Sequence, residues 1–588
     1  MSCYLLKLLV LTALLLISPW YVSGCSSPSE EETLVLAIQM EHYAHMVRDG
    51  AVSGSSGKLI QPCELVYQGA FRLPANASRP NTFAYGGAAM TFNPRGNPSG
   101  QPGNNPGSLF IMGHNRMPYG ELPHGNQVAE VTIPNPLVSH SLNELNQAEF
   151  IQPFHDVAAG FFSTLDEIPR AGMQYLETSE TGPLIHIAFG QHLQEDSEDM
   201  VASHAWFKTD LSTPDMKGTW YIGHQSLYSV NEYIFEIPSG WAEEHTGGRP
   251  LGTGRFKDGG WSGMGPALFA YRPWVDSEGT PAAPGTRLEE MVLLLYESSR
   301  HTNNIVHCLD GYQHPDEWSG GAWLTGDGGK TAVIFAGTKS DGDRYWYGFI
   351  NPAGPDYACV ESAFLGEFTL CRLADGTPCP DEAEATCEGH TSNRGWWSNR
   401  FRARFVFYDP AQLAAVASGD IQPWEPQPYA FLDIDEHLFF NPGEVEPNML
   451  GSGVQRRYRL GDVAYDRENG WIYVLELFAD NAKPVVHTWR IIAEDLPGEW
   501  TIIDGPGEAV PLETAWQINF NKIFSDEEIR LVEISRNETL IPVDLVMLPE
   551  DRQIIVIPRE PYLPGEVYEL RIILENSNMY KMIFTSDD

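Results

Sequence analysis

The chain is short of positive charge. It holds 37 lysines and arginines against 78 aspartates and glutamates among its 588 residues, a formal net charge of −41. A chain this acidic repels the phosphate backbone of nucleic acids and anionic lipid surfaces. The composition therefore argues against nucleic acid as a partner. The acids are scattered rather than grouped, which is also what solubility alone would produce.

Several motifs of enzymes and metal sites are missing. No G-x-S-x-G nucleophile motif is present, and residues 326–331 end like a phosphate-binding loop but carry Leu324 where the first glycine belongs. The four cysteines within 359–387 are spaced by 12, 8 and 8 residues, without the C-x-x-C pair typical of zinc sites. The sequence predicts no metal and no other cofactor.

Long apolar runs are confined to the N-terminus. Lys7 precedes an apolar stretch at 8–18 that ends in small residues, the pattern of a secretion signal rather than a membrane span. Val22-Ser23-Gly24-Cys25 resembles the bacterial lipobox. The resemblance implies export, lipidation of Cys25 and contact with a membrane through this lipid anchor only. Ser26, which follows the cysteine, implies the outer membrane, and ordinary secretion with cleavage nearby stays the alternative.

The first segments are therefore assigned to targeting. Residues 1–24 are predicted to be a lipoprotein signal peptide and 25–59 a lipid-anchored tether, in which 32–50 suits a helix. Six cysteines remain outside these segments, and an even count in an exported chain indicates disulfides. Their pairing stays open. The disulfide candidates are Cys63, Cys308, Cys359, Cys371, Cys379 and Cys387.

One local pattern recurs between residues 60 and 495. An apolar strand ends, a polar turn follows, and a strand rich in glycine and alanine begins. Radial repeats of small sheets have this pattern. The fold class is therefore all-β, with a five-bladed β-propeller at 60–495. The five predicted inner strands are 83–92, 170–177, 260–271, 318–325 and 456–466.

The two ends of the predicted propeller have a natural pairing. The first strand, 64–71, has no blade of its own, and the last blade lacks a fourth strand after 485–491. Pairing these two segments would close the ring and remove two exposed sheet edges. A six-bladed alternative stays open, because 191–255 holds further strand material.

A second domain is predicted at 508–588. Ile518-Asn519-Phe520, the proline-rich segment 558–568 and Phe584-Thr585 resemble the bacterial Ig-like domains of the S-layer type. The resemblance implies a β-sandwich used as a spacer or adhesive module, without catalytic residues.

The predicted propeller carries a resemblance of its own. Residues 85–94, 259–271 and 314–318 are similar to segments of uncharacterised exported bacterial propeller lipoproteins. That resemblance implies a fold and a location but no established activity.

Polar residues precede the predicted inner strands, where propellers form the mouth of a central funnel. Paired carboxylates there could act as general acid and base on a glycosidic bond, and arginines could hold a carboxylated or sulfated sugar. The same residues also fit strand caps and core packing. The catalytic candidates are Asp258, Asp316, Glu317 and Asp462. The ligand-binding candidates are Arg170, Arg255, His314, Trp318 and Arg459.

These features together predict a lipid-anchored envelope protein that binds an extracellular glycan or protein through its funnel. A carbohydrate-active hydrolase or lyase using the four acids is the first alternative. A purely structural envelope protein is the second.

Overall fold

Strands are the main regular element of the described part of the chain. The computed structural model describes residues 36–42, 59–75, 81–97, 104–113, 127–158, 169–191, 201–258, 263–298, 306–346, 359–363, 368–371, 396–445, 450–491, 501–503, 509–512, 514–520, 529–536, 539–548, 553–574 and 579–587. The chain divides into a larger unit, Arg48–Pro497, and a smaller unit, Met1–Val47 with Gly498–Asp588. No helix among the described residues is both long and apolar enough to cross a membrane.

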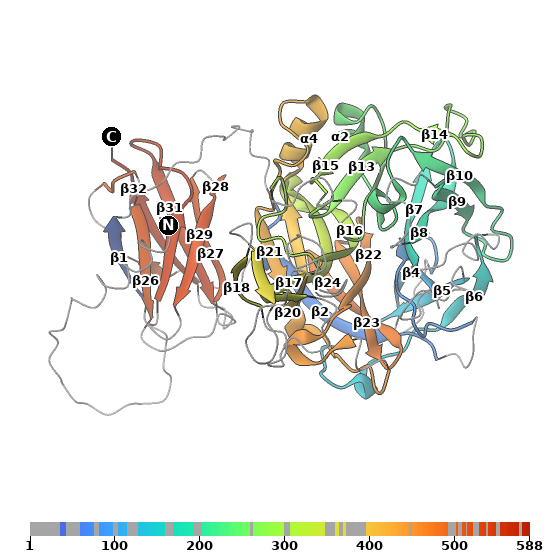
Figure 1. The fold of residues 1–588 in the computed structure, drawn as a ribbon, viewed down its shortest axis with the longest axis horizontal. Coiled ribbons are helices and arrows are strands. Elements are labelled where there is room, and N and C mark those ends of the chain that lie inside the picture. Colours follow the sequence, from blue (N-terminus) through green and yellow to red (C-terminus); the bar gives the residue numbers. More distant parts are fainter. Residues whose placement is uncertain are drawn as a thin grey trace. The chain divides into compact units, whose positions relative to one another are not determined.

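The described residues of the larger unit form five sheets of four or five strands (Figure 1). Sheet 1 contains β3 (Met90–Asn93), β4 (Asn104–Met112), β5 (Gln127–Pro134) and β6 (Phe150–Asp156). Sheet 2 contains β7 (Pro169–Thr178), β8 (Gly182–Gln191), β9 (His204–Lys208), β10 (Lys217–Ile222) and β14 (Arg287–Leu288). Sheet 3 contains β11 (Ile234–Glu236), β12 (Leu251–Thr253), β13 (Ala267–Tyr271) and β15 (Met291–Leu295). Sheet 4 contains β16 (Glu317–Thr325), β17 (Thr331–Trp346), β20 (Trp396–Tyr408) and β21 (Ala430–Asp433).

Sheet 5 joins the two ends of the larger unit. It contains β22 (Leu460–Asp466), β23 (Trp471–Asp480), β24 (Lys483–Ile491) and β2 (Leu65–Arg72). β2 runs antiparallel to β24, with Leu65 opposite Ile491 and Arg72 opposite Val485. The predicted pairing of 64–71 with 485–491 is therefore confirmed. All strand pairs within the five sheets are antiparallel except β10 with β14.

The first strands of the five sheets contact one another in series. β3 lies against β7, β7 against β11, β11 against β16, β16 against β22, and β22 against β3. Glycine permits this approach at two of these contacts. A Cβ on Gly172 of β7 would lie 2.3 Å from the Glu232 carbonyl oxygen, and one on Gly320 of β16 would lie 2.6 Å from the Val463 nitrogen.

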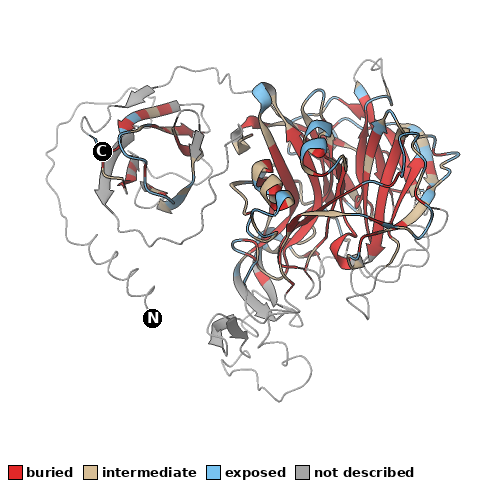
Figure 2. Ribbon diagram, turned by 90° about the horizontal axis from the view of Figure 1, so that it is seen from above, coloured by how far each residue is buried: buried red, intermediate tan, exposed pale blue. Residues whose placement is uncertain are grey.

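Apolar clusters fill the spaces between neighbouring sheets. Figure 2 shows buried residues along the strands of the larger unit and exposed ones on turns and helix surfaces. Each pair of neighbouring sheets shares its own core cluster, and alternation along the strands supplies both faces. Representative pairs, one from each cluster, are Phe110 with Ile185, Trp206 with Phe269, Phe235 with Phe335, Phe405 with Trp489, and Met90 with Val486.

Two short α-helices connect strands of the larger unit. They are α2 (Ser239–His245) and α4 (Pro410–Ser418). Asp409 caps α4 by accepting a hydrogen bond from the Ala411 nitrogen at 2.8 Å, and Gly419 ends the helix in the left-handed conformation. The remaining short elements are the hairpin β18 (Cys359–Ala363) and β19 (Phe368–Cys371) and the 3₁₀ helices Pro62–Glu64, Leu142–Glu144, Leu227–Ser229, Asp327–Gly329, Asp435–His437 and Gly453–Gln455.

The smaller unit is a pair of sheets around one core. One sheet contains β1 (Leu36–His42), β26 (Thr514–Phe520), β30 (Gln553–Pro558) and β29 (Val543–Leu548). The other contains β25 (Thr501–Ile503), β32 (Met579–Thr585), β31 (Val567–Leu574), β27 (Ile529–Arg536) and β28 (Thr539–Ile541). The shared core includes Trp516, Tyr562, Tyr568 and Phe584. Aromatic residues of the proline-rich segment and of the closing strand therefore meet inside this unit.

Two local expectations are wrong. The helix expected within 32–50 is a strand over Leu36–His42, because β1 pairs with β26, from Leu36 opposite Phe520 to His42 opposite Thr514. The expected inner strand at 260–271 contains β13, which lies third in sheet 3, whereas the first strand is the short β11. The additional strand material in 191–255 is taken up by β9, β10, β11 and β12.

Candidate functional site

A hydrogen bond to Asp462 links sheet 5 with sheet 1. Its side chain is fully buried, and its Oδ2 accepts a hydrogen bond from the nitrogen of Met90, the first residue of β3, at 2.8 Å. Oδ1 accepts from the Val463 nitrogen at 2.8 Å. Burial raises the pKa of Asp462 well above its usual range, against these amide hydrogen bonds, and the charge of Glu232 adds to the increase. Each carboxylate oxygen of this predicted catalytic residue therefore accepts a hydrogen bond from a backbone N–H group.

Arg170 and Glu232 join sheet 2 to sheet 3. Both side chains are buried, with 1% and 0% of their surface exposed. Arg170 Nε donates to Glu232 Oε2 at 2.6 Å, and Arg170 Nη2 donates to Oε1, which makes the pair bidentate. The Phe256 ring covers the guanidinium, with its centroid 3.6 Å from the Arg170 Cζ. The predicted ligand-binding arginine is therefore held in a dry ion pair.

Glu317 joins sheet 4 to sheet 3. Lys257 Nζ, from the connection after β12, lies 3.2 Å from Glu317 Oε1, and both side chains are largely buried. The next residue, Trp318, donates its backbone N–H to the Phe256 carbonyl at 2.7 Å. Trp318 has no exposed surface and packs in the core between sheets 3 and 4. The ring expected to contact a ligand is thus part of the core.

Asp316 is held within sheet 4. It accepts hydrogen bonds from the Ser340 nitrogen at 2.8 Å and the Gln313 nitrogen at 3.1 Å, and it forms an ion pair with Lys339 at 3.0 Å. Burial raises its pKa, while Lys339 and the amide hydrogen bonds act in the opposite direction. His314, two residues earlier, is half-buried.

Arg255 and Asp258 lie buried in the connection between β12 and β13. Arg255 donates to the carbonyl oxygens of Gly265 at 3.0 Å and Tyr296 at 3.3 Å. Burial lowers the pKa of Arg255 to about 10, and the charges of Tyr233 and Asp258 oppose this decrease. Asp258 therefore stabilises the charge of Arg255.

Polar contacts of this kind occur at all five junctions between neighbouring sheets. At the junction of sheets 4 and 5, the Arg459 nitrogen donates to Thr338 Oγ1 at 3.0 Å, and the Arg459 guanidinium pairs with Asp435. We call these contacts the polar junctions. They are Thr91 with Tyr175, Arg170 with Glu232, Lys257 with Glu317, Thr338 with Arg459, and Asp462 with Met90.

Most candidates contact residues outside the predicted set: Arg170 contacts Glu232, Glu317 contacts Lys257 and Asp316 contacts Lys339. Lys257 is one of the polar residues that precede a predicted inner strand, whereas sequence reasoning missed Glu232 and Lys339. The catalytic and ligand-binding roles themselves stay predictions. Among the described residues, no cluster of three or more histidines, cysteines or carboxylates fits a metal ion.

The cysteine candidates have different outcomes. Cys308 is a free cysteine packed against the core between sheets 3 and 4, so its expected disulfide is wrong. Burial raises the pKa of its thiol to about 11, which makes it unreactive. The register of β18 and β19 places Cys359 opposite Cys371, and the pairing of the cysteines stays open. Cys25, Cys379 and Cys387 lie outside the described residues, and of Cys63 only the backbone, in the Pro62–Glu64 turn, is described.

Comparison with known proteins gives no family. No family model matches the chain, and no curated protein matches it. A fructosyltransferase from A. japonicus aligns over 90% of this chain and 94% of its own at 10% identity, with a TM-score of 0.23. The plexin A4 extracellular region aligns over 82% of this chain and 52% of its own at 6% identity, with a TM-score of 0.21. Likenesses this distant support neither a fold nor a function.

Proposed function

We propose that the chain is a lipid-anchored envelope protein whose larger unit is a five-bladed β-propeller that binds an extracellular glycan. The serial contacts of the five first strands, the five inter-sheet cores and the pairing of β2 with β24 support the propeller. The lipobox-like Cys25 supports export to the outer membrane, and the aromatic core of the smaller unit supports an Ig-like spacer.

The observation that carries the binding role is a set of unpartnered buried polar atoms. Among the residues that the structure describes, Arg170 Nη1 at the start of β7, and Tyr312 Oη and Ser340 Oγ around the start of β16, have no hydrogen-bond partner. Nearly all buried polar atoms in proteins are satisfied, and exceptions mark functional or solvated places. Hydroxyls donate and accept, whereas the guanidinium only donates. Sugar hydroxyls match this mixture, which favours a glycan at this end of the first strands.

The contacts of the predicted catalytic carboxylates favour a role in binding over a role in hydrolysis. A glycosidase needs two carboxyl groups that face the scissile bond, one as acid and one as base or nucleophile. Here Asp462 and Asp316 accept backbone N–H groups and Glu317 pairs with Lys257. Removing one such acid is therefore expected to weaken the sheet junctions before it changes any reaction.

Removing the Tyr312 hydroxyl is expected to weaken glycan binding. Screening the detergent-solubilised full chain on a glycan array identifies the ligand, and calorimetry then compares wild type with Tyr312→Phe and Ser340→Ala. Loss of one neutral hydrogen bond lowers affinity by roughly two- to tenfold. Tyr271→Phe is the matched control, because the Tyr271 hydroxyl is also buried and unpartnered but lies on β13.

Three outcomes would contradict the proposal. The first is a folded protein that retains no glycan, which leaves the purely structural role. The second is an equal effect of Tyr271→Phe and Tyr312→Phe, which would place the ligand elsewhere. Turnover of a bound glycan would establish the hydrolase or lyase alternative.

A further inference from the structure

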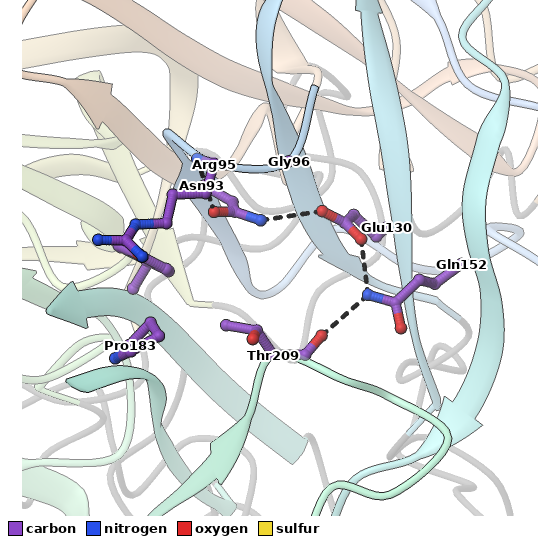
Figure 3. A pocket seen from close by; sticks show the side chains of 8 residues that line it. Asn93, Arg95, Gly96, Glu130, Gln152, Pro183 and Thr209 are labelled. Carbon is purple, nitrogen blue, oxygen red and sulfur yellow. Dashed lines mark hydrogen bonds between the residues drawn. The ribbon is translucent and has the colours of Figure 1, made fainter. Parts of the chain in front are cut away.

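A polar pocket of about 240 Å³ lies between sheets 1 and 2. Asn93 and Arg95 reach it from the end of β3, Glu130 from β5, Gln152 from β6, and Tyr175 and Thr209 from sheet 2. Figure 3 shows the side chains of Asn93, Glu130 and Gln152 converging, with the Thr209 carbonyl facing Gln152. None of these residues belongs to the proposed glycan site. The pocket therefore needs an explanation of its own.

Glu130 is the central group of the pocket. Only 3% of its surface is exposed. Its Oε1 accepts from Asn93 Nδ2 at 3.0 Å and Ser108 Oγ at 2.5 Å, and its Oε2 accepts from Gln152 Nε2 at 2.6 Å. All three donors are neutral, and among the described residues no lysine, arginine or histidine pairs with Glu130. Buried carboxylates usually have a positive partner, so this one lacks its counter-charge.

The side chains of Gln152 and Tyr175 have no hydrogen left to donate to a ligand. Gln152 Nε2 donates one hydrogen to Glu130 and the other to the Thr209 carbonyl oxygen at 2.8 Å. The Tyr175 hydroxyl donates to Glu177 at 2.9 Å. A carboxylate oxygen has two acceptor positions, so Glu130 Oε2 retains one, as does the Thr209 carbonyl. A ligand that fits here must donate hydrogen bonds.

The one cation on the described wall of the pocket is engaged elsewhere. Arg95 pairs with Glu177, and 66% of its side chain is exposed. It therefore does not neutralise the buried Glu130, and it stands at the solvent side of the pocket.

We propose that this pocket binds a small organic ammonium ligand, whose protonated amine donates to Glu130 and to the Thr209 carbonyl. Such a group supplies both the missing positive charge and hydrogen-bond donors for the free acceptor positions of Glu130 Oε2 and the Thr209 carbonyl. Charge-assisted hydrogen bonds of this type are about twice as strong as neutral ones. The inference is independent of the proposed glycan site.

The test uses two ring compounds that differ only in one group. Calorimetry on the full chain at pH 7 compares 4-aminocyclohexanol with cyclohexane-1,4-diol. The amine is expected to bind at least about tenfold tighter than the diol. Equal binding of the diol, or no binding of the amine by the folded protein, overturns the proposal.

Two variants locate the amine, and a third is the control. Glu130→Gln removes the charge with little change of shape and is expected to abolish the preference for the amine. Arg95→Gln removes a positive charge at the solvent side of the pocket, where it repels a cationic ligand, and is expected to tighten amine binding by roughly two- to fivefold. Glu64→Gln changes a buried carboxylate that pairs with Lys330 far from the pocket and is expected to leave binding unchanged. The assignment is overturned if Glu130→Gln still prefers the amine, or if Arg95→Gln binds the amine more weakly than wild type. Tyr312→Phe, which tests the glycan site, is expected to leave amine binding unchanged.

Discussion

Replacing Arg170 with methionine is expected to lower the free energy of unfolding of the larger unit by about 3–5 kcal/mol. The change leaves Glu232 buried at 0% exposure without its bidentate partner. An unpaired charge in a dry interior has lost both its hydration and its counter-charge, so the native state bears the full desolvation cost. Urea unfolding followed by tryptophan fluorescence measures the loss, because Trp206, Trp220 and Trp323 are buried in this unit.

A double variant separates the charge from the packing. Arg170→Met with Glu232→Leu removes both ions and keeps apolar volume beside Phe256, and it is expected to recover most of the lost stability. Lys208→Met is the matched control, because Lys208 pairs with Asp215 at 56% and 45% exposure, and it is expected to cost less than about 1 kcal/mol. If Arg170→Met is as stable as wild type, the ion pair with Glu232 does not stabilise this sheet junction.

The pairing of the two ends of the larger unit can be predicted from the sequence, whereas one first strand cannot. In the predicted arrangement 64–71 has no blade and 485–491 has no outer neighbour, so their pairing follows from the number of strands. The error at 260–271 has a packing cause. Glycine marks close approach in general, and Gly263 makes it beside sheet 3, where an added Cβ would lie 2.4 Å from the Tyr296 carbonyl oxygen that follows β15. Glycine-rich strands therefore do not by themselves identify the ring of first strands.

Neither the strand β1 nor the polar junctions can be predicted from local sequence, because both depend on partners that are distant along the chain. Residues 36–42 suit a helix or a strand locally, and the choice is made by β26, which lies far along the chain. Likewise, the charged residues at strand starts are visible in the sequence, but their partners come from neighbouring sheets. Nothing in the spacing says that Glu317 meets Lys257, or whether Arg170 faces a ligand or a buried acid.

Lowering the pH from 6.5 to 5 is expected to destabilise the larger unit through two buried histidines. His186 and His204 have no exposed surface, and burial lowers the pKa of each to about 3. Within the described part of the chain both ring nitrogens of His186 lack partners, and the Trp206 ring lies edge-on at 5.6 Å. His204 is held by Ser203 and Thr253 at 3.0 Å each. No carboxylate that the structure describes raises the pKa of either ring.

The direction of this pH effect on stability follows from the numbers of protons that the native and unfolded states bind. An unfolded histidine has a pKa of about 6.5, so between pH 3 and 6.5 the unfolded chain binds more protons than the native one. The stability from these histidines is complete above pH 6.5 and falls as the pH decreases. Each contributes about 1.4 kcal/mol per pH unit, hence about 2 kcal/mol between pH 6.5 and 5.

A comparison of variants separates the contribution of the buried histidines from that of the buried aspartates. Asp462 and Asp316 have raised pKa values and act in the opposite direction, so the wild-type slope alone is not diagnostic. Urea unfolding of His186→Phe at pH 6.5 and pH 5 is expected to show a loss about 2 kcal/mol smaller than wild type, since phenylalanine keeps the aromatic packing and cannot bind a proton. The exposed His224→Gln is expected to behave as wild type. Equal losses for wild type and His186→Phe would mean that His186 reaches a proton-stabilising partner, which its two unpartnered nitrogens argue against.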